Sequence, residues 1–231
     1  MQHTLDNPVW CALTGPQADL AIGHGLARHF PRDIAPFSAV AEPTAAAYAD
    51  LGVDLPYGLE ARLFRPQDEA ASQGWETVSS RPIVQMVAQK IAAPPTTAET
   101  EFVVLGPDDA ADMLALAGAA KPGPFGPRTS LLGVYLGVQR AGQLIAMGGE
   151  RLRLPGFVEL SGICVHPSAR GTGLGAAITA HLTHMVLERG ETPFLHVFPD
   201  NPAIALYARL GFFERAQFFV LWHRRLTERP S

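Results

Sequence analysis

A glycine-rich segment carries the residues with the clearest chemical potential in this chain. It spans residues 166–178 and reads HPSARGTGLGAAI. Gly171, Gly173 and Gly175 lack side chains, so an anion can approach their backbone N–H groups closely, and Arg170 adds a positive charge. Apolar residues at helical spacing follow the glycines, and the positive end of a helix also favours an anion. We therefore predict that this segment binds a pyrophosphate group.

The spacing within the segment leaves more than one interpretation open. Gly171, Gly173 and Ala176 fit the dinucleotide fingerprint G-x-G-x-x-G/A. Arg170, Gly173 and Gly175 fit a different cofactor pattern, R-x-x-G-x-G. A P-loop is excluded because no Lys-Ser/Thr pair follows the glycines. The dinucleotide fingerprint normally opens a series of βα units, for which too few residues follow. A purely structural glycine turn also stays open.

The elements that must position this segment follow a stretch rich in Pro and Thr at 92–101, which we interpret as a linker. Hydrophobic periodicity and Gly/Pro punctuation predict the order β-α-loop-β-β-β-α-β-α-β after it. The expected segments are strand 101–106, helix 107–118, an irregular stretch 121–130, strands 131–139, 143–152 and 157–166, helix 174–190, strand 193–198, helix 201–211 and one or two strands over 212–225. This order predicts an α/β domain with a mixed sheet over residues 96–231.

The first part of the chain, residues 1–95, is predicted to form a separate and smaller α/β lobe. Its hydrophobic pattern is harder to interpret, with plausible strands at 18–25 and 80–90 and a short helix over 43–52 that Gly52 would end. This lobe contains no recognisable catalytic motif and no R-x-x-G-x-G pattern. We therefore do not expect it to bind a cofactor by itself.

Composition narrows the classes of partner. The chain has 231 residues, 47% of them hydrophobic, and a formal net charge of −4 without a run of Lys or Arg, which argues against nucleic acid. Neither a membrane-spanning stretch of roughly 18 apolar residues nor a secretion signal is visible. Cys11 and Cys164 suit free thiols and suggest no zinc site. We expect a cytoplasmic protein without metal, nucleic acid or membrane partners; a homodimer is compatible with the sequence.

Two segments together resemble a known family. ICVHPSARGTGLGAAI resembles the cofactor-binding motif of the GNAT superfamily of acyl-coenzyme A-dependent N-acyltransferases, and FLHVFPDNPAIALYARLGFFE resembles its second motif. The resemblance covers Glu99 to about Arg225. It implies a mixed β-sheet flanked by helices, with two splayed central strands. The two-lobed layout is similar to the subgroup of glycine N-acyltransferase-like proteins. For the first lobe of this chain two hypotheses stay open: a degenerate copy of the same fold that walls off the substrate site, or an oligomerisation module.

The resemblance also implies where acetyl-coenzyme A (acetyl-CoA) would bind. The pantetheine arm would pair with the edge of strand 157–166, next to a bulge expected at Ser161-Gly162, and the pyrophosphate would lie on the glycine segment. Asn201 would cap its helix and also contact the cofactor. The cofactor-binding residues implied are Ile163, Cys164, Val165, Arg170, Gly171, Thr172, Gly173, Leu174, Gly175, Ala176, Asn201 and Tyr207.

Two residues are candidates for catalysis of direct acyl transfer from the thioester to an amine. An ammonium group must lose a proton before it attacks, and Glu159 lies where several family members carry the base. The alternative is that Glu159 pairs with Arg151 or Arg153. Tyr207, six residues after Asn201, matches the family tyrosine that protonates the departing thiolate. The alternative is a buried core tyrosine.

Three further groups have weaker support. Cys164, His166 and Glu159 suggest a thiol acyl-enzyme, but residue 159 points to the opposite strand face from residues 164 and 166. His181 and His184 are one helical turn apart, but no further ligand is placed to complete a metal site. The irregular stretch 121–130 lies where the resemblance expects the amine pocket, so Phe125 and Arg128 are candidate substrate-binding residues; an ordinary surface loop is the alternative.

The sequence therefore predicts an N-acetyltransferase that uses acetyl-CoA and acts on a small-molecule amine or an amino acid. A non-catalytic acyl-CoA-binding sensor or partner module is the alternative from another functional class. A nicotinamide-dependent oxidoreductase survives only through the literal glycine match.

Overall fold

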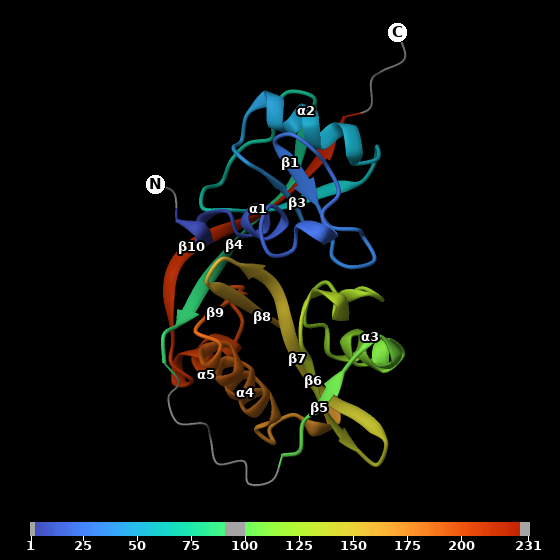
Figure 1. Cartoon of the computed structure of the whole chain (residues 1–231), viewed down its shortest axis with the longest axis vertical. Coiled ribbons are helices and arrows are strands. Elements are labelled where there is room, and N and C mark those ends of the chain that lie inside the picture. The colour runs from blue at the N-terminus through green and yellow to red at the C-terminus, as the bar shows by residue number, and fades with distance from the viewer. Residues whose placement is uncertain (1–2, 91–99, 227–231) are drawn as a thin grey trace.

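The fold is built on one eight-stranded mixed sheet, which the computed structural model describes within residues 3–90 and 100–226. The sheet extends through both the upper and the lower half of the molecule (Figure 1). The strand order is β3-β10-β4-β9-β8-β7-β6-β5. In chain order the strands are β3 (Glu60–Arg65), β4 (Trp75–Ala88), β5 (Val103–Leu105), β6 (Tyr135–Arg140), β7 (Gln143–Leu154), β8 (Phe157–Val165), β9 (Thr192–Val197) and β10 (Phe212–Arg225); β1 (Ala27–His29) and β2 (Ser38–Val40) form a separate pair.

Helices cover both faces of this sheet. Successive residues of a strand point to opposite faces, and in β6 Tyr135 packs with Met113 and Leu116 of α3, whereas Leu136 packs with Ile178 of α4. The α-helices α3 and α4 therefore lie on opposite faces. The helices are α1 (Pro8–Leu13), α2 (Ala45–Asp54), α3 (Ala110–Ala120), α4 (Leu174–Glu188) and α5 (Ala203–Arg209), with short 3-10 segments at Thr4–Asp6, Ala18–Leu20, Pro107–Asp109, Thr129–Leu132 and Pro167–Ala169.

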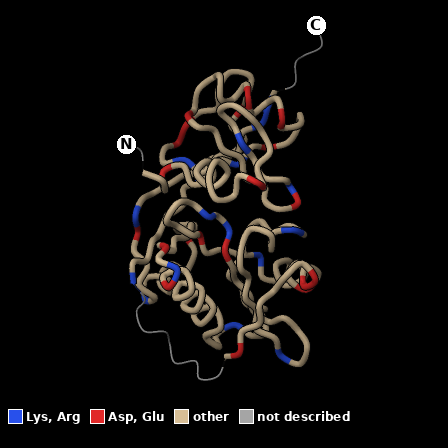
Figure 2. Tube along the Cα trace, viewed as in Figure 1, with Lys and Arg blue, Asp and Glu red and all other residues tan. Residues whose placement is uncertain are grey.

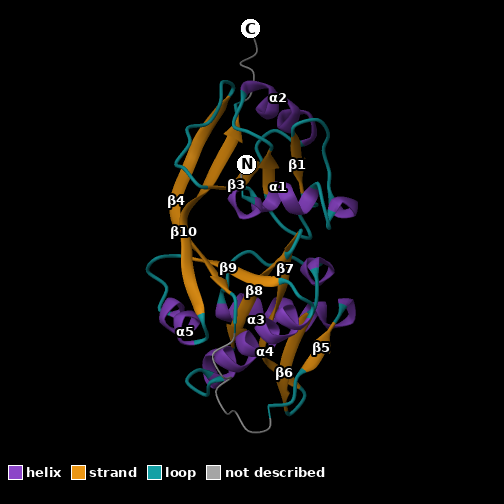
Figure 3. Ribbon diagram, turned by 60° about the vertical axis from the view of Figure 1, so that its left-hand side comes forward, coloured by secondary structure: helices purple, strands orange, loops and turns teal. Residues whose placement is uncertain are grey.

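The first lobe supplies a strand to the middle of the sheet. Strand β4 lies between β9 and β10 and pairs antiparallel with both. Gln85 pairs with His196 of β9, and Val84 pairs with Gln217 of β10. β4 and β10 span both halves of the molecule (Figure 3). Leu5 and Phe30 also pack in one core cluster with Phe194 and Phe218. Sequence segments on both sides of the expected boundary at 95/96 therefore share one sheet and one core.

The predicted linker lies mainly in residues 91–99, outside the residues that the structure describes. The division into domains 1–95 and 96–231 stays a prediction.

Positive and negative side chains are interspersed over both halves of the chain (Figure 2).

The two central parallel strands separate after a short ladder. Strands β8 and β9 pair only at Phe157↔Thr192, Val158↔Pro193 and Glu159↔Phe194. Both strands continue beyond these pairs, β8 to Val165 and β9 to Val197. Their next residues therefore lie along an opening in the sheet, which confirms the expected splayed strands.

The element order predicted for the second half of the chain is confirmed, and 212–225 forms one strand, β10. Two predictions for the first lobe were wrong. Residues 18–25 form a 3-10 turn followed by a single bridge from Ile22 to His29, not a strand. Helix α2 continues past Gly52 to Asp54. The guanidinium of Arg225 donates a hydrogen bond to the Gly52 carbonyl, and a Cβ at Gly52 would meet that side chain at 3.2 Å. Gly52 therefore leaves room for the Arg225 side chain and does not mark the end of the helix.

A fragment that begins at residue 96 should not fold by itself. It would lack β4, so the facing edges of β9 and β10 would carry unpaired backbone groups. We expect no cooperative unfolding transition for the 96–231 fragment by circular dichroism. Mixing it with the 1–95 fragment should restore one. Cooperative unfolding of the 96–231 fragment alone would show that its core is independent of β4.

Candidate active site

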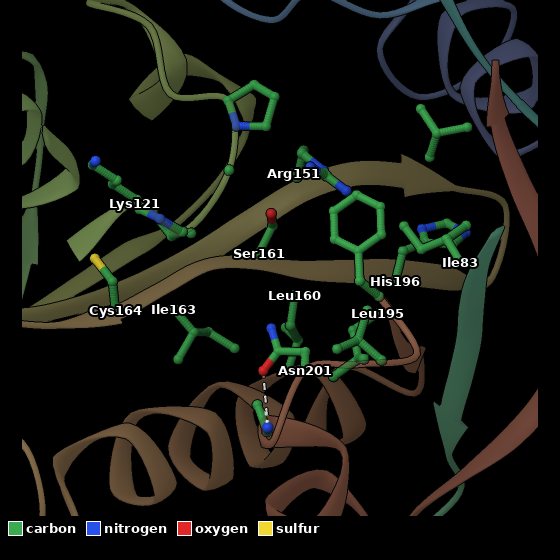
Figure 4. A pocket seen from close by; sticks show the side chains of 18 of the residues that line it. Ile83, Lys121, Arg151, Leu160, Ser161, Ile163, Cys164, Leu195, His196 and Asn201 are labelled. Atoms are coloured by element: carbon green, nitrogen blue, oxygen red, sulfur yellow. Dashed lines mark hydrogen bonds between the residues drawn. The ribbon is translucent and has the colours of Figure 1, made fainter. Parts of the chain in front are cut away.

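A cavity of about 440 Å³ occupies the opening between β8 and β9. The close-up in Figure 4 shows its central side chains, with Cys164 and Lys121 toward one end and His196 and Ile83 toward the other. The cavity lies where the strand ladder stops. Its walls are residues 160–165 of β8, 195–197 of β9, Phe198, Asn201, Ala203 and Tyr207 after β9, residues 120–124 after α3, and Phe37, Arg62, Phe64, Ile83, Arg151, Arg170, Val220 and Trp222.

The free edge of β8 forms one long wall. Met147 pairs with Cys164 and Gly149 with Ser161, so β8 contains one more residue than β7 over this interval. Gly162 lies in this interval with φ +65°, a conformation that glycine adopts without strain. This confirms the bulge expected at Ser161-Gly162. Ile163 follows the bulge, and with Cys164 and Val165 it borders the cavity on the side away from β7.

The glycine segment begins directly after β8. Pro167–Ala169 forms a 3-10 turn and α4 starts at Leu174, with Gly171 and Gly173 at φ +80° and +84°. A Cβ on Gly171 would meet nothing within 4 Å, so this part of the loop is open. The exposed Arg170 lines the cavity.

The N–H groups of this loop are available as donors. The first helical hydrogen bond of α4 is donated by Ala177 to Gly173, so the N–H groups of Leu174, Gly175 and Ala176 precede the helical ladder. Within the described ranges no backbone acceptor contacts the N–H of Gly171, Thr172 or Gly173. The Thr172 hydroxyl donates back to the Ala169 carbonyl at 2.7 Å. The N–H groups from Gly171 to Ala176 thus have no backbone acceptor among the described residues, and of this loop only Arg170 lines the cavity.

Asn201 and Tyr207 lie across the cavity from β8. The Asn201 Oδ1 accepts a hydrogen bond from the Ala203 N–H at 2.9 Å, drawn as a dashed line in Figure 4, so the side chain caps the start of α5. The helix begins at Ala203, two residues after the start of the predicted range 201–211. Tyr207 lines the cavity and packs edge-on against Phe212. Burial raises the pKa of Tyr207 to about 12, so its hydroxyl stays protonated at neutral pH.

Glu159 is held in a buried ion pair behind the cavity wall. Arg151 donates to both of its oxygens, at 2.8 Å from Nε and 2.6 Å from the terminal nitrogen, and His196 Nδ1 lies 2.6 Å from Oε1. Burial alone would raise the carboxyl pKa, but the Arg151 charge and the hydrogen bonds from Arg151 and His196 outweigh it and lower the pKa to about 2. Glu159 is absent from the cavity lining, whereas Arg151 and His196 are part of it.

This geometry favours the ion-pair alternative for Glu159. Both of its oxygens already accept hydrogen bonds, and an incoming amine would meet Arg151 or His196 first. A base role for Glu159 stays a prediction, and it needs a proton path through one of these two side chains.

The hydrogen bonds of His196 define its tautomer. The Gln85 amide nitrogen contacts the Leu5 carbonyl at 3.0 Å, and the Gln85 oxygen accepts from Arg215 at 2.8 Å, so the amide orientation is fixed. The same amide nitrogen lies 3.0 Å from His196 Nε2, which must therefore accept. Nδ1 is then the nitrogen that donates to Glu159. Neither ring nitrogen is then free to take a proton from a substrate.

The two candidate substrate-binding side chains do not line the cavity. Phe125 packs edge-on against Tyr135. Arg128 forms an ion pair with Asp33 at 3.1 Å and is largely exposed. The loop instead contributes residues 120–124 to the wall. A substrate role for Phe125 and Arg128 stays a prediction that the cavity geometry does not support.

The weaker constellations separate in space. Burial raises the pKa of the Cys164 thiol to about 12, and His166 Nδ1 lies 2.7 Å from the Ser168 hydroxyl. His181 packs against Phe102, whereas His184 pairs with Glu188 at 3.0 Å. Within residues 3–90 and 100–226, His, Cys, Asp and Glu side chains form no group of three that could hold a metal ion. Over the same ranges every helix is too short or too polar to cross a lipid bilayer.

The first lobe contributes cavity residues that the sequence pattern did not predict. Phe37, Arg62, Phe64 and Ile83 line the cavity, and Phe64 stacks on His196 with ring centroids 4.7 Å apart. The one available signal was the alternation in β3, where Arg62 and Phe64 share one strand face. That pattern cannot reveal which element the face will meet.

Comparisons with known proteins agree with this geometry. The family model named FR47-like protein matches residues 135–221. A solved structure from Novosphingobium aromaticivorans, assigned to the GNAT family of acetyltransferases, is 35% identical over 98% of this chain and 100% of its own, with a TM-score of 0.87. A GCN5-related N-acetyltransferase from Kribbella flavida is 22% identical over 88% of each chain, with a TM-score of 0.59, and shows the fold alone. No curated protein sequence matches the chain.

The Glu159 ion pair should make stability depend on acid pH. Because the folded pKa lies near 2 and the unfolded value near 4.3, ionised Glu159 stabilises the fold above about pH 5, and this contribution is lost as the pH falls toward 2. Glu159→Gln should lower the free energy of unfolding at pH 7 by about 3–5 kcal/mol, because it leaves the Arg151 charge buried and unpaired.

Urea unfolding followed by circular dichroism between pH 3 and pH 7 measures both effects. The Glu159→Gln variant should lose stability less steeply than the wild type over this range. Glu214, an exposed carboxylate, offers the matched control Glu214→Gln, which should leave the profile unchanged. Parallel profiles for the wild type and Glu159→Gln would contradict the assigned ion pair.

Proposed function

Because the chain belongs to the GNAT family of acetyltransferases, we propose that it transfers an acetyl group from acetyl-CoA to the amine of a small molecule or an amino acid. The observation that carries this proposal is the opening between β8 and β9, which leaves a free strand edge directly beside an anion-binding loop. An extended, amide-containing chain that ends in phosphates suits these two features together.

The residues present suit acetyl-CoA in three respects. The β8 edge at Ile163, Cys164 and Val165 offers backbone groups to an amide-bearing arm. The free N–H groups from Gly171 to Ala176 would hold the pyrophosphate, and Arg170 would add a charge-assisted contact. The thioester supplies an acyl carbon that is already activated toward an amine.

Direct attack by the amine is favoured over an acyl-enzyme. A cysteine nucleophile must be ionised, and burial raises the pKa of Cys164 to about 12. His166, the base that this alternative requires, contacts Ser168 instead. The chain's own role is then to hold both reactants in the cavity, where orientation supplies much of the rate.

Tyr207 is proposed to protonate the departing sulfur. It lines the cavity, and its raised pKa keeps the proton on the hydroxyl at neutral pH. A thiolate leaves more readily when a proton is available to it. The packing of Tyr207 against Phe212 keeps the ring in one place on α5.

Arg170→Ala should weaken acetyl-CoA binding about 10-fold, because a hydrogen bond to a charged group contributes roughly 1.5–3 kcal/mol and this exposed side chain gives the low end. Thermal shift with acetyl-CoA and with NAD measures the effect. Saturating acetyl-CoA should raise the wild-type midpoint by several degrees, and NAD should not.

Arg140→Ala removes a positive charge at the β6–β7 turn and serves as the matched control for Arg170→Ala. It should bind acetyl-CoA as the wild type does. A shift with NAD alone would overturn the proposed cofactor. Binding of acetyl-CoA without thiol release from any of a panel of amines would favour the non-catalytic acyl-CoA-binding alternative.

Tyr207→Phe should lower kcat about 100-fold, the lower range for loss of a general acid, with little change in the Kd of acetyl-CoA. Thiol release under saturating acetyl-CoA gives kcat, and titration calorimetry gives the Kd. Tyr57→Phe is the matched control, because Tyr57 is half-exposed and stacks with Arg225 outside the cavity. An unchanged kcat in Tyr207→Phe would remove the acid role.

A further inference from the structure

We propose that Arg62 binds a carboxylate on the acceptor, so that the substrate is an amine that also carries a negative charge, as an amino acid does. This inference rests on the proposed function and narrows its acceptor class. The first lobe, which contains Arg62, would then take part in recognising the acceptor.

Arg62 faces the cavity without a partner for its charge. It lies on β3, lines the cavity, and its Nε is buried with no hydrogen bond to any described residue. Two other arginines have a carboxylate partner for their charge. Arg65 pairs with Glu69 at 2.9 Å, although its own Nη1 is also buried without an acceptor among the described residues, and Arg224 pairs with Glu60 at 3.0 Å. A buried guanidinium donor without an acceptor is costly, so its place in a cavity points to an acceptor that arrives with a ligand.

The surroundings of Arg62 add positive potential. Arg32 is close enough that, after the effect of burial, the Arg62 charge lowers its pKa further, whereas Glu60, which pairs with Arg224, raises it. The charged side chains that line the cavity are Arg62, Lys121, Arg151 and Arg170, and no Asp or Glu among the described residues joins them. Glu159 neutralises Arg151. The remaining cations leave the cavity suited to negatively charged ligands.

Arg62 lies at the end of the cavity opposite the anion-binding loop. Arg170 follows β8, next to Cys164 and Val165. Arg62 pairs in register with Trp222, and its β3 neighbour Phe64 stacks on His196, which Figure 4 shows at the other end from Cys164. If the pyrophosphate of acetyl-CoA occupies the Arg170 end, the anion at Arg62 belongs to a second molecule, the acceptor.

Aromatic side chains surround this second anion site. The Arg62 guanidinium lies 5.9 Å from the Trp222 ring centre, and Phe37 and Phe64 line the same wall. Apolar walls reduce the local dielectric constant and strengthen a pair between guanidinium and carboxylate, whose geometries match in a bidentate contact. A carboxylate held there would direct the amine of the same molecule toward the middle of the cavity.

Matched acceptors test the inference. We expect thiol release with phenylalanine or glycine to exceed that with phenylalaninamide or glycinamide, which lack the carboxylate. Arg62→Gln should lower kcat/KM for the carboxylates about 10- to 100-fold, the range for a hydrogen-bonded charge, and leave the amides nearly unchanged. The kcat/KM of Arg62→Lys for the carboxylates should lie between those of the wild type and Arg62→Gln, since lysine keeps the charge but not the bidentate guanidinium geometry.

The variant itself should fold, because Arg62 Nε donates no hydrogen bond that the fold would lose. Arg140→Gln, which removes one positive charge outside the cavity, should leave both acceptor series unchanged. Equal rates for carboxylate and amide in the wild type, or equal losses for both in Arg62→Gln, would overturn the inference.

A binding measurement separates failure of the inference from failure of the proposed function. In the presence of coenzyme A, N-acetylphenylalanine should bind the wild type at least 10-fold more tightly than N-acetylphenylalaninamide, and Arg62→Gln should lose the difference. This preference without thiol release from any amine would support the anion site and refute the transferase function. Thiol release without any carboxylate preference would support the transferase function and refute the anion site. If neither probe binds, the anion site is also refuted.

Discussion

The opening between β8 and β9 can exist only because each strand is held by another neighbour. A sheet that separates in its middle leaves buried backbone groups unpaired on both sides. Strand β7 holds β8, and β4, which comes from the first lobe, holds β9 through Gln85↔His196 and its neighbours. The cavity therefore depends on β4, which precedes its neighbour β9 by more than a hundred positions in the chain.

A chain of buried polar groups closes the point where the strands part. Arg151 on β7, Glu159 on β8, His196 on β9 and Gln85 on β4 are linked in that order by hydrogen bonds of 2.6 to 3.0 Å. Buried charges are costly unless each has its partners, and here both oxygens of Glu159 are satisfied. One polar side chain from each of four strands thus fixes where the ladder ends.

The same network explains why a carboxylate in the expected place does not face the cavity. Glu159 lies on the correct strand for a base, but Arg151 on the neighbouring strand takes both of its oxygens. Arg151 in turn packs its guanidinium against Phe37 and Phe64. The cavity is left with cationic and aromatic walls, to which the first lobe contributes Phe37, Arg62 and Phe64.

The sequence by itself determined the parts that depend on neighbours in the chain. The open loop at Gly171 and Gly173, the bulge at Gly162 and the cap by Asn201 are all local, because backbone conformation and helix ends depend on residues a few positions apart. The order of elements after residue 100 followed from the same short-range periodicity.

Only the tertiary structure decided which distant side chains meet. No local pattern links Gln85 with His196, Arg62 with Trp222, or Arg128 with Asp33. The position of β4 inside the sheet, the partners of Glu159 and the unpaired charge of Arg62 all result from such long-range pairings. They depend on the strand order and register of the whole sheet, which the sum of many weak contacts selects and which short-range spacing does not encode.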